Sequence, residues 1–223
     1  MNAEASTGAE PSPEKRWWLR VLAVFQSPRP VFAALRDESP REAEAREEPV
    51  LALILLAGIA GILLAPATGR VFDEDLVDGS VAVLSVLVFL SGAIYGVATY
   101  WLGGAALYVG LRGAGSTGSY RRARHLLAFA AAPMVLGLLL VWPLRLLVYG
   151  TDSFRTGGSD DGIGPVLFGV ASGAFVLWSL GLLVYGIAVV ERWSILRAAV
   201  SIALAVLAIL VITFPFVITL ASS

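Results

Sequence analysis

Five long apolar blocks, separated by short polar segments, follow one another along most of the chain. They span residues 50–68, 81–111, 126–149, 165–190 and 198–220. A hydrocarbon core about 30 Å thick is crossed by roughly 20 apolar residues in an α-helix. Only helices and closed barrels satisfy their backbone hydrogen bonds in lipid, and these blocks lack the alternating polarity of barrel strands. The pattern therefore predicts an all-α membrane protein, built as a bundle of five transmembrane helices.

The second block is longer than one untilted span requires. It contains 31 residues without a charge, residues 81–111. A helix of this length must tilt, extend beyond the bilayer or bend. The pair Gly103–Gly104 is the expected place for a bend, because sharp changes of helix direction concentrate at such residues.

The charges in the connecting loops predict the orientation of the chain. The loop before the third block carries arginines and no acidic residue: Arg112, Arg121, Arg122 and Arg124. The loop before the second block is acidic and sets a single arginine against Asp73, Glu74, Asp75 and Asp78. Arginine-rich loops stay in the cytoplasm. We therefore expect a cytoplasmic N-terminus, an extracytoplasmic C-terminus and a multi-pass protein of the cell membrane.

The chain divides into three regions. Residues 1–16 are polar and rich in Ala, Glu and Pro, which predicts a disordered tail. Residues 17–48 are predicted to form a cytoplasmic juxtamembrane segment. Residues 49–223 contain the five blocks and form the predicted transmembrane domain.

The juxtamembrane segment has an amphipathic pattern. Its apolar start, from Trp17 to Phe25, is interrupted by Arg20, and the Ser27-Pro28 pair predicts the beginning of a helix. Tryptophan and arginine close to a span suit the headgroup zone of a bilayer. We therefore expect an N-terminal interfacial amphipathic segment. Packing of this segment against the other helices is the alternative.

Composition narrows the range of functions. Of the 223 residues, 57% are hydrophobic and 15% are charged, and the formal net charge is −1. Nucleic-acid-binding proteins carry a basic stripe that this charge balance lacks, so we expect no nucleic-acid partner. The chain has no cysteine and a single histidine, His125. This excludes thiolate metal sites, a cysteine nucleophile and metal sites built on paired histidines.

The motifs that resemble catalytic signatures lack the surroundings that catalysis needs. Gly113–Gly118 reads G-x-G-x-x-G, but a membrane span precedes it in place of the strand of a dinucleotide-binding fold. Ser172 lies among small residues, yet no His or Lys base occurs within a span. No Asp or Glu lies in the five blocks, which disfavours an ion-coupled carrier. We expect no catalytic residue, no metal site and no cofactor, and a protein that is not an enzyme.

A compact basic patch is the first candidate site. It consists of five residues around the third block: Arg112, Tyr120, Arg121, Arg122 and Arg124. Each cationic side chain near an anionic leaflet contributes about 1 kcal/mol of attraction. The patch is a candidate contact for lipid or a partner protein. The alternative is that these arginines only set the orientation.

Small residues four positions apart are the second candidate feature. They occur as Gly92 and Gly96 in the second block and as Gly169 and Gly173 in the fourth. Such pairs let helix backbones approach closely in lipid. The sequence therefore predicts helix-packing faces, either within one chain or between two copies in a homo-oligomer.

Three stretches together resemble the prokaryotic form of the Yip1-domain family. Residues 28–35 form a Pro-aromatic amphipathic segment before the first span. Gly113-x-Gly115-Ser116, Tyr120 and the run Ala-Phe-Ala-Ala-Ala-Pro at 128–133 lead into the third span. The turn Trp-Ser-Ile-Leu-Arg-Ala at 193–198 enters the fifth span, so the resemblance covers residues 21–220.

The resemblance implies a multi-span scaffold. Eukaryotic members of the family act in vesicle traffic with small Rab-type GTPases. Their Asp-Leu-Tyr-Gly-Pro motif before the first span is absent from this sequence, so Rab binding is not carried over. The expected partners are membrane lipids and other membrane or cytoplasmic proteins.

We therefore expect a non-enzymatic integral membrane protein that organises membrane or recruits partners, as a Yip1-like scaffold. The alternative is a permease-like protein for a small neutral solute. A permease requires a continuous polar path lined by side chains of the spans: Ser85, Ser91, Tyr95, Thr99, Tyr100, Ser172, Ser179 or Tyr185.

Overall fold

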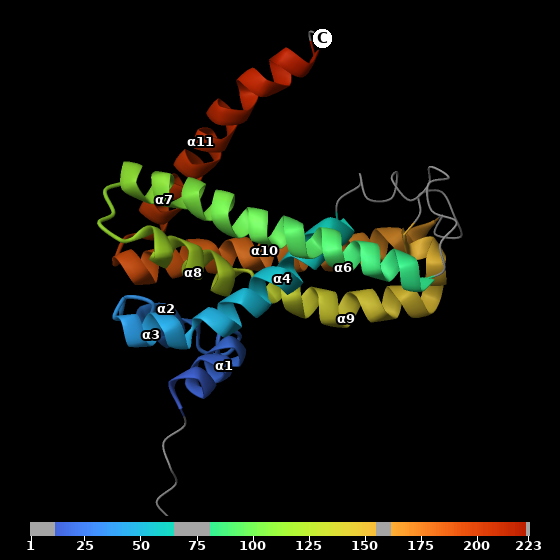
Figure 1. Ribbon diagram of the computed structural model, residues 1–223, viewed down its shortest axis with the longest axis horizontal. Coiled ribbons are helices and arrows are strands. Elements are labelled where there is room, and N and C mark those ends of the chain that lie inside the picture. Colours follow the sequence, from blue (N-terminus) through green and yellow to red (C-terminus); the bar gives the residue numbers. More distant parts are fainter. Residues whose placement is uncertain (1–11, 65–80, 155–161, 222–223) are drawn as a thin grey trace, which may run out of the picture.

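The computed structural model describes residues 12–64, 81–154 and 162–221 of the chain. In these ranges the protein is helical, and no strand is found (Figure 1). The acidic loop before the second span and the predicted tail up to residue 11 lie outside the described residues.

Within the described residues, five helical segments are long and apolar enough to cross a membrane, which confirms the prediction from the apolar blocks. In the second segment α6 and α7 join through a π-helical turn, and in the third α8 and α9 join at Ala131. The bounds of the helices in these segments are α4 (Glu47–Leu64), α6 (Val81–Ala98), the π-helical turn (Thr99–Gly103), α7 (Gly104–Gly113), α8 (Tyr120–Ala130), α9 (Ala132–Tyr149), α10 (Ile163–Glu191) and α11 (Ile195–Ala221).

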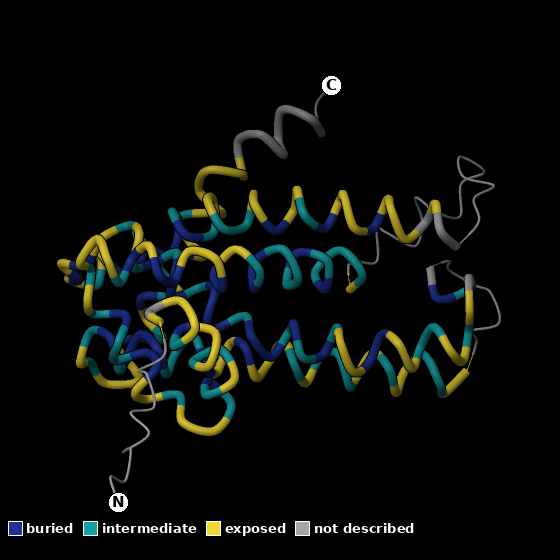
Figure 2. Tube along the Cα trace, turned by 60° about the horizontal axis from the view of Figure 1, so that its bottom comes forward, coloured by how far each residue is buried: buried dark blue, intermediate teal, exposed yellow. Residues whose placement is uncertain are grey.

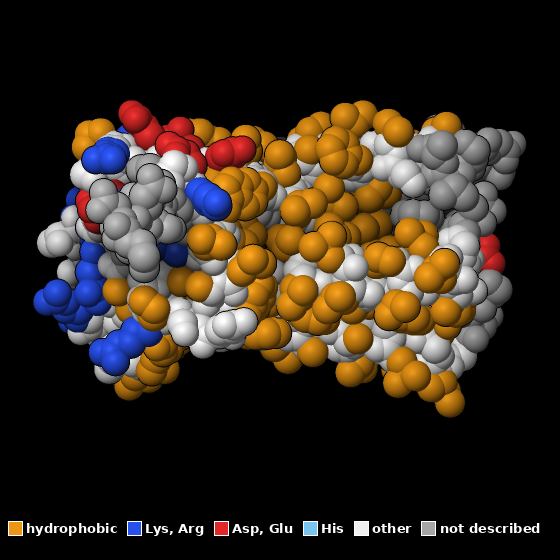
Figure 3. All heavy atoms as spheres, turned by 90° about the horizontal axis from the view of Figure 1, so that it is seen from below, with side chains coloured by type: hydrophobic (Ala, Val, Ile, Leu, Met, Phe, Trp, Pro, Cys, Tyr) orange, Lys and Arg blue, Asp and Glu red, His pale blue; other side chains and the backbone are white. Residues whose placement is uncertain are grey.

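The bundle is built around α4. This helix packs against α6 and α9, and α9 packs in turn against α10 (Figure 1). The last helix, α11, packs mainly against α7 and then leaves the bundle toward the C-terminus. The flank of the bundle carries a broad belt of apolar side chains, as expected for a surface that contacts lipid (Figure 3).

The second span departs from regular α-helix in a π-helical turn, Thr99–Gly103, next to the glycine pair where a bend was predicted; both glycines have ordinary α-helical dihedral angles. The π-helical turn ends at Gly103, and α7 begins at Gly104. A side chain on Gly104 would collide with the stem of Arg124 from α8. Glycine at this position therefore allows α8 to lie directly against the second span.

Three short helices precede the first span, and each begins with a Ser-Pro pair. They are α1 (Pro13–Ala23), α2 (Pro28–Ala34) and α3 (Pro40–Ala45). Proline suits the first helical position because its fixed φ fits a helix and its missing N–H would have had no partner there. Ser12 caps α1 by accepting a hydrogen bond from the Lys15 N–H. Ser27 precedes α2 as predicted but makes no side-chain cap hydrogen bond.

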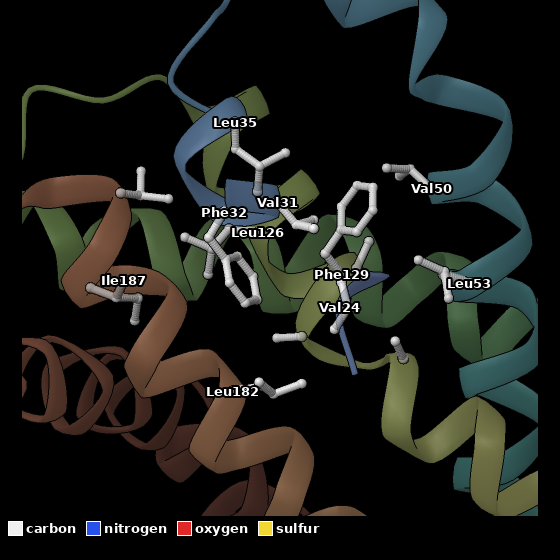
Figure 4. Packing of buried hydrophobic residues seen from close by; sticks show 14 of the residues in the cluster. Val24, Val31, Phe32, Leu35, Val50, Leu53, Leu126, Phe129, Leu182 and Ile187 are labelled. Atoms are coloured by element: carbon white, nitrogen blue, oxygen red, sulfur yellow. The ribbon is translucent and has the colours of Figure 1, made fainter. Parts of the chain in front are cut away.

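The apolar side of the N-terminal segment forms part of the protein core. Trp17, Phe32 and Leu35 are completely buried. Phe32 and Leu35 lie beside Leu126 and Phe129 from α8 and near Ile187 from α10 (Figure 4). Burial of an aromatic or Leu side chain contributes about 1.5–3 kcal/mol. These helices are therefore held against the bundle by a continuous apolar contact.

The opposite side of α1 is exposed. Trp18 is 39% exposed, Leu19 52% and Leu22 65%. Burial alternates in the same way between the two sides of the long helices (Figure 2). One side of the N-terminal segment packs against the other helices, as in the alternative given in the sequence analysis. Contact of the outer side with the membrane interface stays a prediction.

The predicted glycine pairs lie in different surroundings. Gly92 and Gly96 face Gly58 and the neighbouring backbone of α4, so closely that a side chain on any of them would strike main-chain atoms. Gly92 and Gly96 are thus used within the chain, where small residues let α4 and α6 approach. A side chain added at Gly169 or Gly173 would meet nothing within 4 Å. Among the described residues, nothing covers their face of α10.

Candidate functional site

Charged side chains gather at the end of the bundle where the N-terminal helices pack (Figure 3). We call this end the cap. It comprises residues 12–46, 112–125 and 190–198. The cap brings together segments that are far apart in the sequence, and it contains the basic patch predicted above.

A buried Arg–His pair lies at the centre of the cap. Arg46 is fully buried between α3 and α4, and its Nε donates a hydrogen bond of 2.8 Å to Nδ1 of His125. Its Nη1 donates to the Asp37 carbonyl oxygen at 2.9 Å, whereas its buried Nη2 has no hydrogen-bond partner. Because Nδ1 of His125 accepts this bond, the imidazole is neutral and carries its proton on Nε2.

Trp17 closes this buried pair from one side. The Arg46 guanidinium lies 5.4 Å from the Trp17 ring centroid, and the indole N–H donates to Glu42 at 3.0 Å. Trp17 also packs against Phe129, with ring centroids 5.5 Å apart. This tryptophan therefore connects α1 with α3 and α8, a role that its position in an apolar run did not indicate.

Acidic residues from two distant segments bind the start of α8. Arg122 forms an ion pair of 2.8 Å with Glu38 and a longer one of 3.8 Å with Glu191 at the end of α10. Ser116 donates a hydrogen bond of 2.8 Å to Glu191. The Gly113–Gly118 loop is thus fixed by a carboxylate, and it serves as a structural turn between two helices.

The α2 helix is fixed to the end of α10. The guanidinium of Arg36 donates to the carbonyl oxygens of Val189 and Val190, two of the acceptors left open where a helix ends. The ring of Phe32 occupies the space that a side chain at Gly186 would fill.

Between α2 and α3, the Ser39 backbone N–H and hydroxyl both donate hydrogen bonds to the Asp37 carboxylate. These bonds lower the pKa of Asp37 below its usual value.

The five residues of the predicted basic patch have different surroundings. Arg112 donates to the Tyr108 hydroxyl and to the Ser116 carbonyl oxygen, and Arg122 is paired with acids as described. Arg121 is exposed, and Arg124 is enclosed by aromatic rings. Arg121 and Arg124 line one cleft, and Tyr120 contacts Arg124 beside it. Arg112 lies elsewhere in the cap.

An aromatic cage surrounds Arg124. Its guanidinium carbon lies 4.0 Å from the ring centroid of Trp101, 4.7 Å from that of Tyr120 and 4.8 Å from that of Tyr100. Tyr100 and Trp101 belong to the π-helical turn, and their ring centroids lie 5.9 Å apart. The Tyr120 hydroxyl donates to the Trp101 carbonyl oxygen at 2.6 Å and fixes the cage. Each cation–π contact contributes about 0.5–1 kcal/mol, or more when desolvated.

Two open depressions border the cap. The first, which we call the cap groove, has a volume of about 370 Å³ and is lined by Arg29, Arg36, Tyr185, Ala188, Val189, Arg192 and Trp193. The second, which we call the α4–α8 cleft, has a volume of about 600 Å³ and is lined by Glu47, Glu48, Val50, Leu51, Ile54, Val97, Tyr100, Trp101, Arg121, Arg124 and His125. Each depression combines arginine with aromatic side chains.

The interior of the bundle is closely packed around the small cavity that Ser172 lines. This cavity has a volume of about 10 Å³, which is room for about one water molecule. Ser91 bonds to carbonyl oxygens of its own helix, and the buried hydroxyl of Ser179 has no partner. In the described ranges, no group of three His, Asp or Glu side chains could hold a metal ion.

Five membrane-length helices, an apolar flank and a charged cap define a multi-span α-helical membrane protein. The model of the Yip1 domain matches residues 22–217, and the chain therefore belongs to the Yip1-domain family. This confirms the resemblance found in the sequence. Neither the search of curated proteins nor that of solved structures gave a match.

Proposed function

We propose that this protein is a non-enzymatic scaffold of the cell membrane, which recruits a partner protein through the cap on the cytoplasmic side. The cap groove carries the proposal, because it is a cationic and aromatic surface with fixed walls. Membership of the Yip1-domain family supports a scaffold role, since this family generally interacts with other proteins.

The walls of the cap groove are held in place by internal contacts. Arg36 bonds to carbonyl oxygens at the end of α10, and Phe32 packs over Gly186 of the same helix. Ordering side chains on binding costs about 0.5–1.5 kcal/mol for each flexible group. A groove that is already shaped avoids part of this cost.

The chemistry of the cap groove suits an acidic segment of a partner. Arg29 and Arg192 are exposed at its edge, and none of the described residues that line it is acidic. Tyr185 and Trp193 add aromatic surface. Arginine, tyrosine and tryptophan are the residues that dominate binding energy at protein interfaces. We propose an acidic, extended or helical segment as the occupant.

The permease alternative draws no support from the packing of the bundle. Its proposed path requires polar side chains from several spans along one channel. Instead, Ser172 lines a cavity of about 10 Å³, and Tyr95 lies on the exposed flank. Of the other path residues, Ser85 lines a separate depression of about 230 Å³ and Tyr100 lines the α4–α8 cleft.

Site-specific photo-crosslinking in native membranes tests the proposal. A photoreactive amino acid at Arg29 or Arg192 should give discrete crosslinks to protein, and the same group at Ile212, on the exposed flank of α11, should not. The double variant Arg29→Glu with Arg192→Glu should abolish binding of a partner found in this way, whereas Arg41→Glu on α3 should leave binding unchanged. Crosslinks to lipid alone at both groove positions would overturn the proposal.

A further inference from the structure

The α4–α8 cleft changes character along its depth. Glu47, Glu48, Arg121 and Arg124 lie at its end near the cap, together with the rings of Tyr100 and Trp101. Its other end is lined by apolar side chains: Val50, Leu51, Ile54 and Val97. From Glu47 to Ile54 the helix rises about 10 Å into the bundle. A ligand that fills this cleft must therefore be polar at one end and apolar at the other.

The charges of the cleft do not satisfy one another. The side chains of Glu47, Glu48 and Arg121 make no ion pair and no hydrogen bond with any described residue. They are opposite charges that line one cleft and remain apart. A ligand that carries both a positive and a negative group would complement them without requiring a rearrangement.

Arg124 and His125 bring hydrogen-bond donors to the lining of the cleft. The Arg124 guanidinium contacts the faces of three aromatic rings, and its buried Nε has no hydrogen-bond partner. His125 is 1% exposed, and its Nδ1 is occupied by Arg46, so Nε2–H is the donor that remains. A charged donor such as the Arg124 guanidinium binds phosphate oxygens strongly, and the neutral His125 imidazole is a weaker donor. The aromatic cage fixes Arg124 and so prepares it for such an acceptor.

We propose that the α4–α8 cleft binds a zwitterionic glycerophospholipid with a primary ammonium headgroup, that is, phosphatidylethanolamine. The phosphate contacts Arg121 and Arg124, with His125 as a further donor. The ammonium group bonds to Glu47 and Glu48. One acyl chain follows the apolar end of the cleft into the bundle flank. The site stands independently of partner recruitment in the cap groove, because it uses other residues.

The choice of headgroup follows from charge and from the cage. Two acidic and two cationic side chains line the cleft, so a lipid with a net negative charge would meet repulsion from the carboxylates. A quaternary ammonium group is bound best by aromatic faces, but Arg124 already occupies them. A primary ammonium group donates three hydrogen bonds, and carboxylates accept them. Ethanolamine is therefore favoured over choline and glycerol.

Lipid titration of the purified full chain tests the proposal. The delipidated protein in detergent is titrated with phosphatidylethanolamine, phosphatidylcholine or phosphatidylglycerol, and bound lipid is counted by native mass spectrometry. The first binding event should be about tenfold tighter for phosphatidylethanolamine than for the other two lipids. Glycerophosphoethanolamine and inorganic phosphate, which lack acyl chains, should not compete at equal concentration. Strong competition by either would show a site for a soluble phosphate and overturn the lipid assignment.

Variants separate the roles of the two charge types. Glu47→Gln with Glu48→Gln should remove the preference for phosphatidylethanolamine over phosphatidylcholine. The variant should still bind both lipids, with equal affinity. Arg124→Gln should weaken the binding of all three lipids about tenfold. Leu51→Trp fills the apolar end of the cleft without changing a charge, and it should also weaken the binding of all three lipids. The matched control, Arg41→Gln with Glu44→Gln, removes one charge of each sign from exposed positions on α3. It should leave the affinity for each of the three lipids unchanged.

Three further results would overturn the proposal. The first is equal affinity of the wild-type protein for all three lipids, which indicates annular lipid only. The second is a preference for phosphatidylglycerol, which indicates an anionic-lipid site. The third is an unchanged preference in the Glu47→Gln/Glu48→Gln variant. Both glutamates are exposed, so this variant is expected to fold, and its thermal unfolding temperature checks that it does.

Discussion

Arg46 and His125 are 79 residues apart in the sequence, and a buried hydrogen bond of 2.8 Å joins them where α3, α4 and α8 meet. The arginine is fully buried, so its cationic group depends on the few acceptors within reach. These acceptors are the imidazole and one backbone carbonyl oxygen. The pair therefore connects the start of the first span, at Arg46, with the start of the third span, at His125.

Replacing His125 should destabilise the cap. His125→Leu removes the acceptor of the Arg46 Nε and leaves a buried charged donor unsatisfied, at a cost of about 1–3 kcal/mol. His125→Gln retains an amide oxygen that can accept the bond, and it should cost less. Thermal unfolding of both variants in the same detergent provides the comparison. Equal unfolding temperatures for His125→Leu and the wild type would contradict this role.

Truncating Phe32 should loosen the N-terminal helices from the bundle. The ring is completely buried and packs over Gly186, so Phe32→Ala should cost about 3–5 kcal/mol. Hydrogen exchange should then rise in α1 to α3, while the spans keep their protection. The control Phe89→Ala changes a ring that is 58% exposed on the bundle flank and should affect exchange in α1 to α3 far less.

The two glycine pairs should respond differently to a larger side chain. In Gly96→Leu the new Cβ would lie 2.5 Å from the Ile54 carbonyl oxygen, so α4 and α6 must separate. Overpacking of this kind typically costs about 1–3 kcal/mol. Gly169→Leu points into open space and should leave the monomer intact. Thermal unfolding measures the first effect, and dimer content in nanodiscs shows whether the second variant disrupts contact between copies.

The predicted orientation can be tested because the chain has no cysteine of its own. Arg41→Cys places a thiol on the cap, and Ile163→Cys places one at the opposite end of α10. A membrane-impermeant maleimide applied to intact cells should label the second variant alone. In inside-out vesicles it should label the first alone. The reverse pattern would show that the N-terminus is outside the cytoplasm.

Apolar length was sufficient to predict the spans, because a bilayer imposes a nearly fixed length on any helix that crosses it. The packing of the N-terminal segment could not be predicted in the same way. Trp17 and Phe32 suit a membrane interface and a protein core equally, so the pattern left both alternatives open. Only the three-dimensional arrangement shows that these side chains face α8 and α10.

Sequence proximity was a poor guide to the surroundings of the arginines. Arg122 and Arg124 are two residues apart, yet the first pairs with Glu38 and Glu191 and the second enters an aromatic cage. The acids and rings come from segments far away in the chain. His125 was noted as the single histidine, but nothing local indicated that Arg46 would be its partner.

The last helix is anchored to the protein over a short stretch. Gly110 of α7 packs tightly against the backbone of α11 at Ser201 and Ala205, and farther along almost every described side chain of α11 up to Phe214 is exposed. An apolar helix fitted loosely to its neighbours adjusts its tilt until its length matches the hydrocarbon thickness. We therefore expect the inclination of α11 to vary with the thickness of the bilayer, so that membranes of different lipid chain length hold the C-terminus at different distances from the bundle.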